Sequence, residues 1–317
     1  MKVSNIMKYI TLESLDVKVS AIGLGCWQFG DPNWGWSSEL NEEKAIKIIQ
    51  EAFNLGVNFF DTAEIYGEGI SEQVLGKALK GIRDEVVIAT KVAPFHLRYK
   101  DVIKACEGSL KRLNTDRIDL YQIHWPHNYI PLRETAKALD ELYLQNKIRA
   151  VGVSNFPVPM IRELKRYLKH APLVSNQVQY NLIERLAEKE IIRYCKRMKM
   201  IIIAYSPLAQ GLLTGKYNLT NIPTDNIRKG KAWFKKENFE KIMNVLKELE
   251  IIAKKYEKKL SQIALNWIIS HSNTIAIPGA KSIEQLRENI EAGNFQLKRE
   301  DFRYISKLTE NLELDYF

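Results

Sequence analysis

Short runs of apolar, largely β-branched residues alternate along this chain with longer segments in which apolar and polar residues are mixed. Eight of these runs are almost continuously apolar, as expected for strands that are buried on both faces of a parallel sheet. The predicted strands are 19–27, 57–63, 86–92, 118–125, 148–156, 173–181, 200–207 and 274–280.

The segments between these runs carry apolar residues at every third or fourth position, which is the spacing of one helix face. The first begins with Asn41 as a cap, continues with two acidic residues and stops at Gly56. Regular alternation of strands and helices predicts an α/β fold, specifically a (β/α)8 TIM barrel, with an eight-stranded doubly wound sheet as the alternative. The predicted helices are 41–56, 71–81, 101–113, 133–147, 160–170, 188–199 and 282–293.

Several segments lie outside this repeat. Residues 8–18 predict a hairpin before the first strand, and two additional helices are expected at 237–260 and 300–311. The connection 208–236 is long for a compact domain, and such loops usually have a function. Because no Gly-, Ser- or Pro-rich linker divides the chain, we expect a single domain over 1–317.

Composition narrows the possible partners. The formal net charge is +9, but the basic residues are scattered, and the densest runs, 228–236 and 254–259, accompany no known nucleic-acid-binding motif. The second run is read as a solvated helix face. We therefore expect no nucleic-acid partner, and the oligomeric state stays open.

The cysteines and the apolar runs bear on location. Cys26, Cys106 and Cys195 are far apart and form no CxxC pair, which favours a reducing compartment. No stretch approaches the roughly 20 apolar residues of a membrane span, and the first 20 residues do not resemble a signal peptide. These features predict a cytoplasmic protein without a membrane partner.

Polar residues stand at the ends of three consecutive predicted strands: Asp61, Lys91 and His124, with Tyr66 in the loop after the first of them. In a (β/α)8 barrel the carboxyl ends of the strands meet at the active face. A buried ammonium needs an anion, which Asp61 can supply to Lys91. A nearby ammonium lowers the pKa of a tyrosine, and a histidine can hydrogen-bond a substrate oxygen. Together they predict an acid–base site for a carbonyl group.

Taken singly, each of these residues is also compatible with a different role. Asp61 could be a turn former, and His124 a hydrogen-bonded core histidine. A strand-end lysine also suits a Schiff-base aldolase, although that lysine must be neutral and the neighbouring acid opposes this. His124 and His127 have an H-x-x-H spacing, but Trp125 and Pro126 interrupt it and no ligand cluster completes it, so we expect no metal.

The motifs DTAEIYGEG, IATK, DRIDLYQIHWP, GVSNF, NQVQYN, YSPLAQGLLTGKY and IPGAKSIEQLRENI resemble, in order and spacing, those of the aldo-keto reductase superfamily. The resemblance runs from about residue 10 to 295 and is closest to the mainly microbial group related to the potassium-channel β subunits. It implies a TIM barrel that binds NADPH (NADP+) without a Rossmann fold and reduces small-molecule aldehydes and ketones. It further implies Tyr66 as general acid, Lys91 and Asp61 as the pair that tunes it, and His124 as the residue that orients the carbonyl.

The resemblance also implies cofactor-binding residues, carried over motif by motif. For the nicotinamide these are Ser154, Asn155, Gln177 and Tyr205; for the pyrophosphate Ser206, Leu208, Gly211, Lys216 and Arg228; for the adenosine end Gly279, Lys281, Gln285, Glu288 and Asn289. Lys281 is the hypothetical partner of the 2′-phosphate that NADPH has and NADH lacks.

The implied substrate pocket is aromatic, with Trp27, Trp34, Trp36 and Trp125, and with Phe95 as a further candidate. Cys26 departs from the family pattern, where many relatives carry threonine. The alternative function is a nucleotide-binding regulatory or redox-sensing subunit with little turnover. The channel β subunits carry asparagine at the position of His124, so the histidine favours an enzyme.

Overall fold

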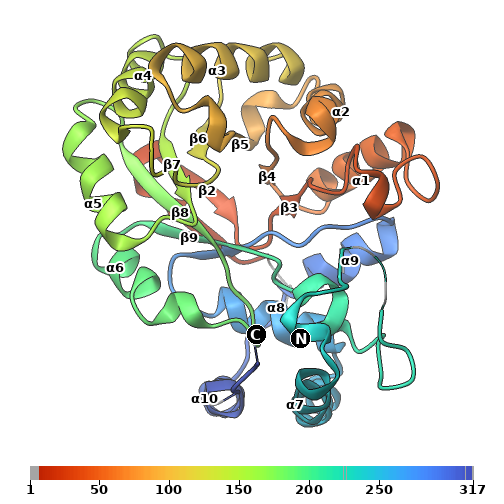
Figure 1. Cartoon of the computed structure of the whole chain (residues 1–317). Helices are drawn as coiled ribbons and strands as arrows, with labels where there is room; N and C mark the ends of the chain where they lie inside the picture. Colours follow the sequence, from red (N-terminus) through yellow and green to blue (C-terminus); the bar gives the residue numbers. More distant parts are fainter. Residues whose placement is uncertain (1–6, 224, 226, 311, 316–317) are drawn as a thin grey trace.

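Parallel strands form one curled sheet at the centre of the molecule (Figure 1), and in the described part of the chain this sheet has eight strands. The computed structural model describes residues 7–223, 225, 227–310 and 312–315, so the N-terminal residues 1–6 considered above lie outside it. The strands are β3 (Leu24–Gly25), β4 (Phe59–Asp61), β5 (Val87–Val92), β6 (Leu120–Ile123), β7 (Val151–Ser154), β8 (Leu173–Gln179), β9 (Ile201–Tyr205) and β10 (Thr274–Ala276).

The order of the strands in the sheet follows their order in the chain, from β3 to β10. A doubly wound sheet instead reverses direction at a switch point, so this alternative is wrong. At the two ends of the sheet, Ile22 and Ala276 form a parallel bridge, and the Gly23 N–H donates to the Ala276 carbonyl at 2.8 Å. The predicted α/β class and the parallel sheet are thus confirmed.

Helices cover the outside of the sheet (Figure 1): α1 (Glu42–Asn54), α2 (Ile70–Ala78), α3 (Tyr99–Leu113), α4 (Leu132–Leu144), α5 (Val158–Tyr167), α6 (Ile191–Arg197), α8 (Leu260–Ile269) and α9 (Ile283–Glu291). The predicted cap of α1 is confirmed, because the Asn41 side chain accepts a hydrogen bond from the Lys44 N–H at 3.0 Å.

One helix of the ring, α8, was not predicted. The expected helix 237–260 corresponds to α7 (Lys236–Lys255), and a separate helix then starts at Leu260. Every residue of α8 is buried, so the segment lacks the polar face on which recognition of an amphipathic helix depends.

Helices α7 and α10 (Arg299–Glu310) lie outside the ring (Figure 1), as the two predicted additional helices. Residue 311, the last of the predicted final helix, lies outside the described residues. Lys255 of α7 pairs with Asp301 of α10 at 2.8 Å.

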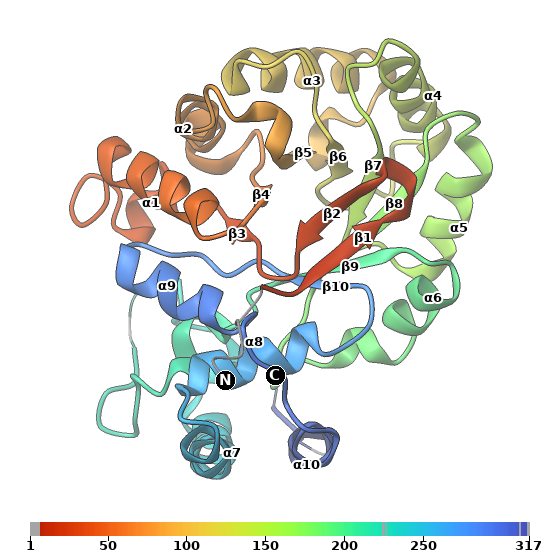
Figure 2. The same cartoon turned by 180° about the vertical axis from the view of Figure 1, so that it is seen from behind.

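A hairpin of β1 (Tyr9–Leu12) and β2 (Val17–Ser20) crosses in front of the sheet in Figure 2, which views the molecule from the side opposite to Figure 1, and this confirms the predicted hairpin. Val19 and Ser20 belong to this hairpin, so the expected strand 19–27 begins too early. Arg149, just before β7, fastens the hairpin by donating to the Leu15 carbonyl at 3.0 Å.

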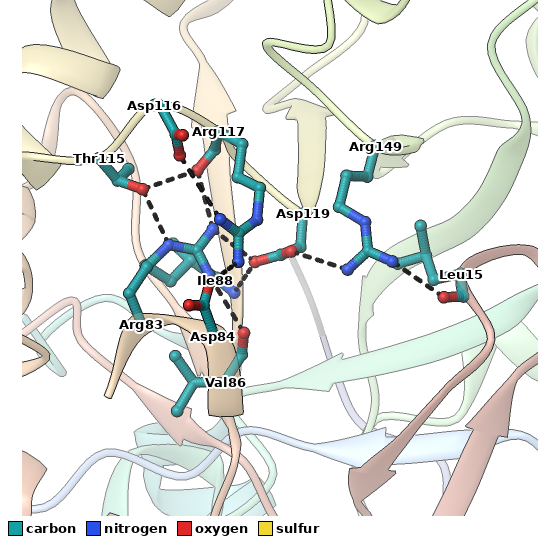
Figure 3. A network of polar contacts seen from close by, with 10 residues as sticks. All are labelled: Leu15, Arg83, Asp84, Val86, Ile88, Thr115, Asp116, Arg117, Asp119 and Arg149. Carbon is teal, nitrogen blue, oxygen red and sulfur yellow. Dashed lines mark hydrogen bonds and ion pairs between the residues drawn. The ribbon is translucent and has the colours of Figure 1, made fainter. Parts of the chain in front are cut away.

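The same arginine belongs to a polar network at the end of the sheet where the strands begin (Figure 3). Asp119, only 1% exposed, pairs with Arg83 at 2.7 Å and with Arg149 at 3.2 Å. Its carboxylate also accepts from the Ile88 N–H at 2.9 Å. The buried charge is therefore fully partnered, as a buried carboxylate must be.

Candidate active site

A cavity of about 760 Å³ lies where the strands end, with walls from the ends of β4 and β6–β10 and from the loops that follow β3, β4 and β9. Its size is within the range of small-molecule sites, and its position is the one at which (β/α)8 enzymes carry their chemistry. Of the predicted catalytic residues, Asp61, Tyr66 and His124 line this cavity, and Lys91 contacts Asp61 and Tyr66.

Lys91 is the centre of the site and is fully buried. Asp61 pairs in register with Ala89, two residues before Lys91, so the carboxylate and the lysine side chain leave the sheet on the same face. The Lys91 ammonium donates to Asp61 Oδ1 at 2.6 Å, to the Thr62 carbonyl at 2.9 Å and to Tyr66 Oη at 3.2 Å. All three of its protons therefore have acceptors.

The second carboxylate oxygen of Asp61 accepts from two glutamines. Gln122 Nε2 lies 3.0 Å away and Gln177 Nε2 lies 2.7 Å away. Gln122 was not predicted, and its one signal in the sequence is that it is the single amide inside the apolar run 118–125. Gln177, predicted only for the cofactor, here also orients Asp61.

The charge of Lys91 follows from these contacts. Burial by itself lowers the pKa of the ammonium, but Asp61 and Tyr66 oppose it and the pKa ends above its usual value. Lys91 is therefore protonated at neutral pH, which argues against the Schiff-base aldolase.

Tyr66 differs from the expectation in one respect. Burial raises the pKa of its hydroxyl, the Lys91 ammonium lowers it, and the balance is a raised pKa. The expected lowering by Lys91 is present, but burial has the larger effect and Asp61 adds to it, so the pKa of Tyr66 ends above its usual value. The hydroxyl is protonated at neutral pH and available as a proton donor.

His124 lies beside Tyr66, with ring centroids 5.6 Å apart and planes at 79°. Burial, and after it the charge of Lys91, lowers the pKa of His124 to about 3, so the ring is neutral. Its Nδ1 is buried and has no partner among the described residues. A neutral imidazole with free hydrogen-bonding capacity suits a substrate oxygen.

A glycine holds the loop that carries Tyr66. Gly67 has φ +54°, and a Cβ there would come within 2.6 Å of the Gly30 Cα. The loops after β3 and β4 can pack this closely only because neither has a side chain at the contact. This contact holds the backbone next to Tyr66 in place.

The predicted cofactor residues all line the cavity: Ser154, Asn155, Gln177, Tyr205, Ser206, Leu208, Gly211, Lys216, Arg228, Gly279, Lys281, Gln285, Glu288 and Asn289. Ser154 stands opposite Gln177 in the β7–β8 register, and Tyr205 Oη donates to Asn155 Oδ1 at 3.1 Å. The structure thus brings together motifs that are more than 100 residues apart in the sequence.

This part of the cavity fits an anionic, elongated ligand. Its walls carry four basic side chains, those of Lys216, Arg228, Lys259 and Lys281. Gln210 Oε1 is buried beside them without a hydrogen-bond partner among the described residues. The basic groups suit the phosphates of a dinucleotide, and an unpaired acceptor oxygen suits one of its hydroxyl or amino groups.

Lys259 is exposed to solvent, as expected for its run of charges, but it also lines the cavity, where it pairs with Glu288 at 2.6 Å. Other lining residues that were not predicted include Gln28, Asp31, Ile65, Gln210 and Thr214. They lie in loops beside the recognised motifs, and this position in the sequence was the only indication that they line the cavity.

The aromatic end of the cavity includes Trp27, Trp34 and Trp125, as predicted, but Trp36 does not line it. Trp36 is half-buried and packs against the core, so it does not contribute to the described cavity. Gly35, at φ +88°, turns the backbone between Trp34 and Trp36, so the two indoles point in different directions. Phe95 is 61% exposed and also lies outside the lining.

Two kinds of feature are absent from the described residues. Within the described ranges, no three His, Cys, Asp or Glu side chains are grouped so that they could hold a metal ion. No helix in the described part of the chain is both long and apolar enough to cross a membrane.

The sequence model of the Aldo/keto reductase family matches residues 21–310, and the chain belongs to this family. The predicted resemblance is confirmed. The family is one of oxidoreductases that act on aldehyde and ketone carbonyl groups.

Individual relatives match over nearly the whole chain. An uncharacterized oxidoreductase of Mycobacterium tuberculosis is 42% identical over 92% of this chain and 89% of its own length. The NADH-specific methylglyoxal reductase of Escherichia coli is 34% identical over 97% of this chain and 100% of its own. The aldo/keto reductase from Klebsiella pneumoniae, solved in complex with NADP and acetate, is 30% identical and superposes with a TM-score of 0.77 over 96% of each chain.

Proposed function

We propose that this protein is an NADP(H)-dependent reductase that converts small aldehydes and ketones to alcohols. The observation that carries the proposal is the chain of contacts from Asp61 to Lys91 at 2.6 Å and from Lys91 to Tyr66 Oη at 3.2 Å. It connects a protonated phenol at the cavity wall to a buried, fixed positive charge.

Tyr66 is the proton donor in this proposal. When bound, NADPH supplies the hydride for the carbonyl carbon. Tyr66 Oη gives its proton to the carbonyl oxygen, and the phenolate that remains is stabilised by the Lys91 ammonium and reprotonated from water. The product is the alcohol, and the same groups act in reverse for oxidation.

Two further residues prepare this step. Asp61 keeps Lys91 protonated and in place. His124, which is neutral, donates a ring N–H to the carbonyl oxygen and so stabilises the negative charge that develops there. The Trp27 and Trp125 side chains form the apolar wall for the rest of the substrate.

For the cofactor, the fourteen lining residues described above are the proposed contacts, with Tyr205 against the nicotinamide and Lys216 and Arg228 near the pyrophosphate. The preference for NADP(H) rests on Lys281, which offers a cation to a 2′-phosphate. The relatives do not decide this choice, because the Klebsiella structure holds NADP and the E. coli enzyme is NADH-specific.

Barrel closure, a single domain and a cytoplasmic location are proposed together with this function. We infer that the Ile22–Ala276 bridge closes the sheet into a complete (β/α)8 barrel, which forms a single domain over 1–317. The three cysteines are free and buried, which suits a reducing compartment, so the cytoplasm is the proposed location.

The experiment is Tyr66→Phe, assayed by NADPH absorbance with a panel of aromatic and short aliphatic aldehydes and ketones. We expect the rate to fall by about 10²- to 10⁴-fold, as for loss of a general acid, with NADPH binding near wild type. Tyr129→Phe is the matched control, because Tyr129 is 88% exposed and lies outside the cavity lining. An unchanged rate in Tyr66→Phe would refute the assignment, and a wild-type protein that binds NADPH without turnover would favour the regulatory subunit.

A further inference from the structure

The loop between β3 and α1 is attached at two points to the basic end of the cavity. The Arg228 guanidinium carbon lies 5.3 Å from the Trp34 ring centroid, which is within cation–π range. Further along the loop, Glu39 Oε2 lies 3.0 Å from Lys281 Nζ. Both basic residues are among those proposed above to hold the cofactor.

A tight turn positions the Glu39 carboxylate. The Glu39 and Leu40 N–H groups both donate to the Gly35 carbonyl, at 2.8 and 2.9 Å, and Leu40 is buried beneath the loop. A Cβ on Gly35 would lie 3.1 Å from Glu39 Oε2, so the glycine leaves room for the carboxylate. The loop conformation, with Gly35 at φ +88°, thus directs this acid toward Lys281.

The surroundings of Glu39 are strongly positive. The hydrogen bond from Lys281 and its charge lower the pKa of the carboxyl, and Lys216 and Lys44 lower it further. Lys281 and Lys216 both line the cavity. An ionised carboxylate therefore sits where the cavity walls are suited to attract the anionic groups of a ligand.

We propose that Glu39 is a specificity-determining residue: its carboxylate competes with a 2′-phosphate for Lys281 and reduces the preference for NADP(H) over NAD(H). The inference rests on the proposed function. NAD(H) has no 2′-phosphate and leaves the Glu39–Lys281 pair intact, whereas NADP(H) must displace it. Displacement is feasible because the pair is open to solvent, with side-chain exposures of 33% for Lys281 and 70% for Glu39, and exposed pairs are weak.

The test is Glu39→Gln, which keeps the shape and removes the charge. Binding of NADP+ and NAD+ is measured by titration calorimetry without a carbonyl or alcohol, so that no turnover contributes. We expect NADP+ to bind about three- to fivefold more tightly, because the weak pair that competes for Lys281 is lost, and the NAD+ affinity to change by less than about twofold.

Two controls isolate the effect. Glu43→Gln removes the same charge four residues further on, where the carboxylate pairs with Lys47 on the surface, and should leave both affinities unchanged. In a Lys281→Ala background, Glu39→Gln should no longer alter the ratio of the two affinities, because there is no cation left to compete for.

The outcomes separate the two proposals. An unchanged ratio of NADP+ to NAD+ affinity in Glu39→Gln overturns the inference. An equal increase in both affinities also overturns it, because Glu39 would then oppose the binding of any dinucleotide. A wild-type protein that binds neither NADP+ nor NAD+ instead overturns the proposed function. A changed ratio that persists in the Lys281→Ala background would show that Glu39 acts through another residue and would also overturn the inference.

Discussion

Replacing Asp61 by asparagine is the sharpest perturbation of the proposed site, because this carboxylate has three side-chain donors. Lys91 approaches one oxygen at 2.6 Å, and the amides of Gln122 and Gln177 approach the other at 3.0 and 2.7 Å. Asparagine has one acceptor oxygen, and its NH2 group would face two donating amides. It also leaves the Lys91 ammonium buried without an anion.

The expected loss of stability is large. Breaking a buried ion pair by removing one partner typically costs about 3–5 kcal/mol of unfolding free energy. Lys91 can relieve part of this by losing its proton, since burial then acts on its pKa without the opposing carboxylate. Each unit by which the pKa falls below that of the unfolded chain corresponds to about 1.36 kcal/mol.

The sign of the pH dependence follows from linkage. In the wild type the folded pKa of Lys91 is raised, so its contribution to stability is present below the unfolded pKa of about 10.5 and is lost as pH rises through the folded pKa. In Asp61→Asn the folded pKa is depressed, the unfolded state binds more protons, and stability rises with pH. The stability gap between variant and wild type should therefore narrow between about pH 7 and 9.

Urea unfolding at about pH 7 and pH 9 measures the difference in unfolding free energy between the wild type and Asp61→Asn. Steady-state reduction of an aldehyde measures the effect on activity. We expect the rate to fall by about 10²- to 10³-fold, since the phenolate of Tyr66 would lose its stabilising cation. The control is Asp119→Asn in the network of Figure 3, which should also destabilise the protein but with no narrowing of the gap, because Arg83 and Arg149 do not lose protons in this range. Equal pH behaviour of the two variants, or wild-type turnover in Asp61→Asn, would contradict the reasoning.

Two further outcomes can be checked independently. Because the pKa of His124 is lowered to about 3, kcat/KM should show no inflection from this residue between about pH 5 and 8, and an inflection near 6.5 that disappears in His124→Gln would refute a neutral role. Gly76→Ala in α2 should lower the unfolding free energy by about 1–3 kcal/mol, because the added Cβ would lie 2.3 Å from the Leu113 carbonyl oxygen. Urea unfolding measures this loss as a lower midpoint concentration. Gly108→Ala in α3 is the matched control: its Cβ would meet only the movable end of Arg112 at 3.1 Å, so the higher helix propensity of alanine should leave stability unchanged or raised, and equal loss in both variants would contradict the packing argument.

The fold was predictable where one local signal dominated. Strands buried on both faces are nearly continuous in apolar residues, and each of the eight predicted runs contains a strand of the sheet in the described chain. Helix α8 escaped prediction because a helix buried on all sides has no amphipathic period. The first strand was too long in the prediction because hydrophobicity does not distinguish Val19 of the hairpin from Leu24 of the parallel sheet.

The site was predictable to the extent that it follows from topology. Asp61, Lys91 and His124 meet because neighbouring parallel strands end at the same edge, so their positions could be inferred without coordinates. The direction of side chains in loops could not be inferred from the sequence. Trp36 is the example, because it follows the backbone turn at Gly35 and packs against the core. The balance of burial and charge at Tyr66 also required the structure, because sequence reveals the neighbouring charge but not the degree of burial.

The two buried carboxylates of the sheet explain why lysine, and not arginine, stands beside Tyr66. Asp119, where the strands begin, is held by guanidinium groups, which present several donors in a fixed fork and stay charged at any working pH. Asp61, where the strands end, is partnered by a compact ammonium whose three protons go to Asp61, Thr62 and Tyr66. A planar guanidinium could pair with the carboxylate, but it could not reach these three acceptors from a single atom. Lys91→Arg should therefore keep the positive charge and the pairing with Asp61, but it should no longer stabilise the phenolate of Tyr66 at the same time.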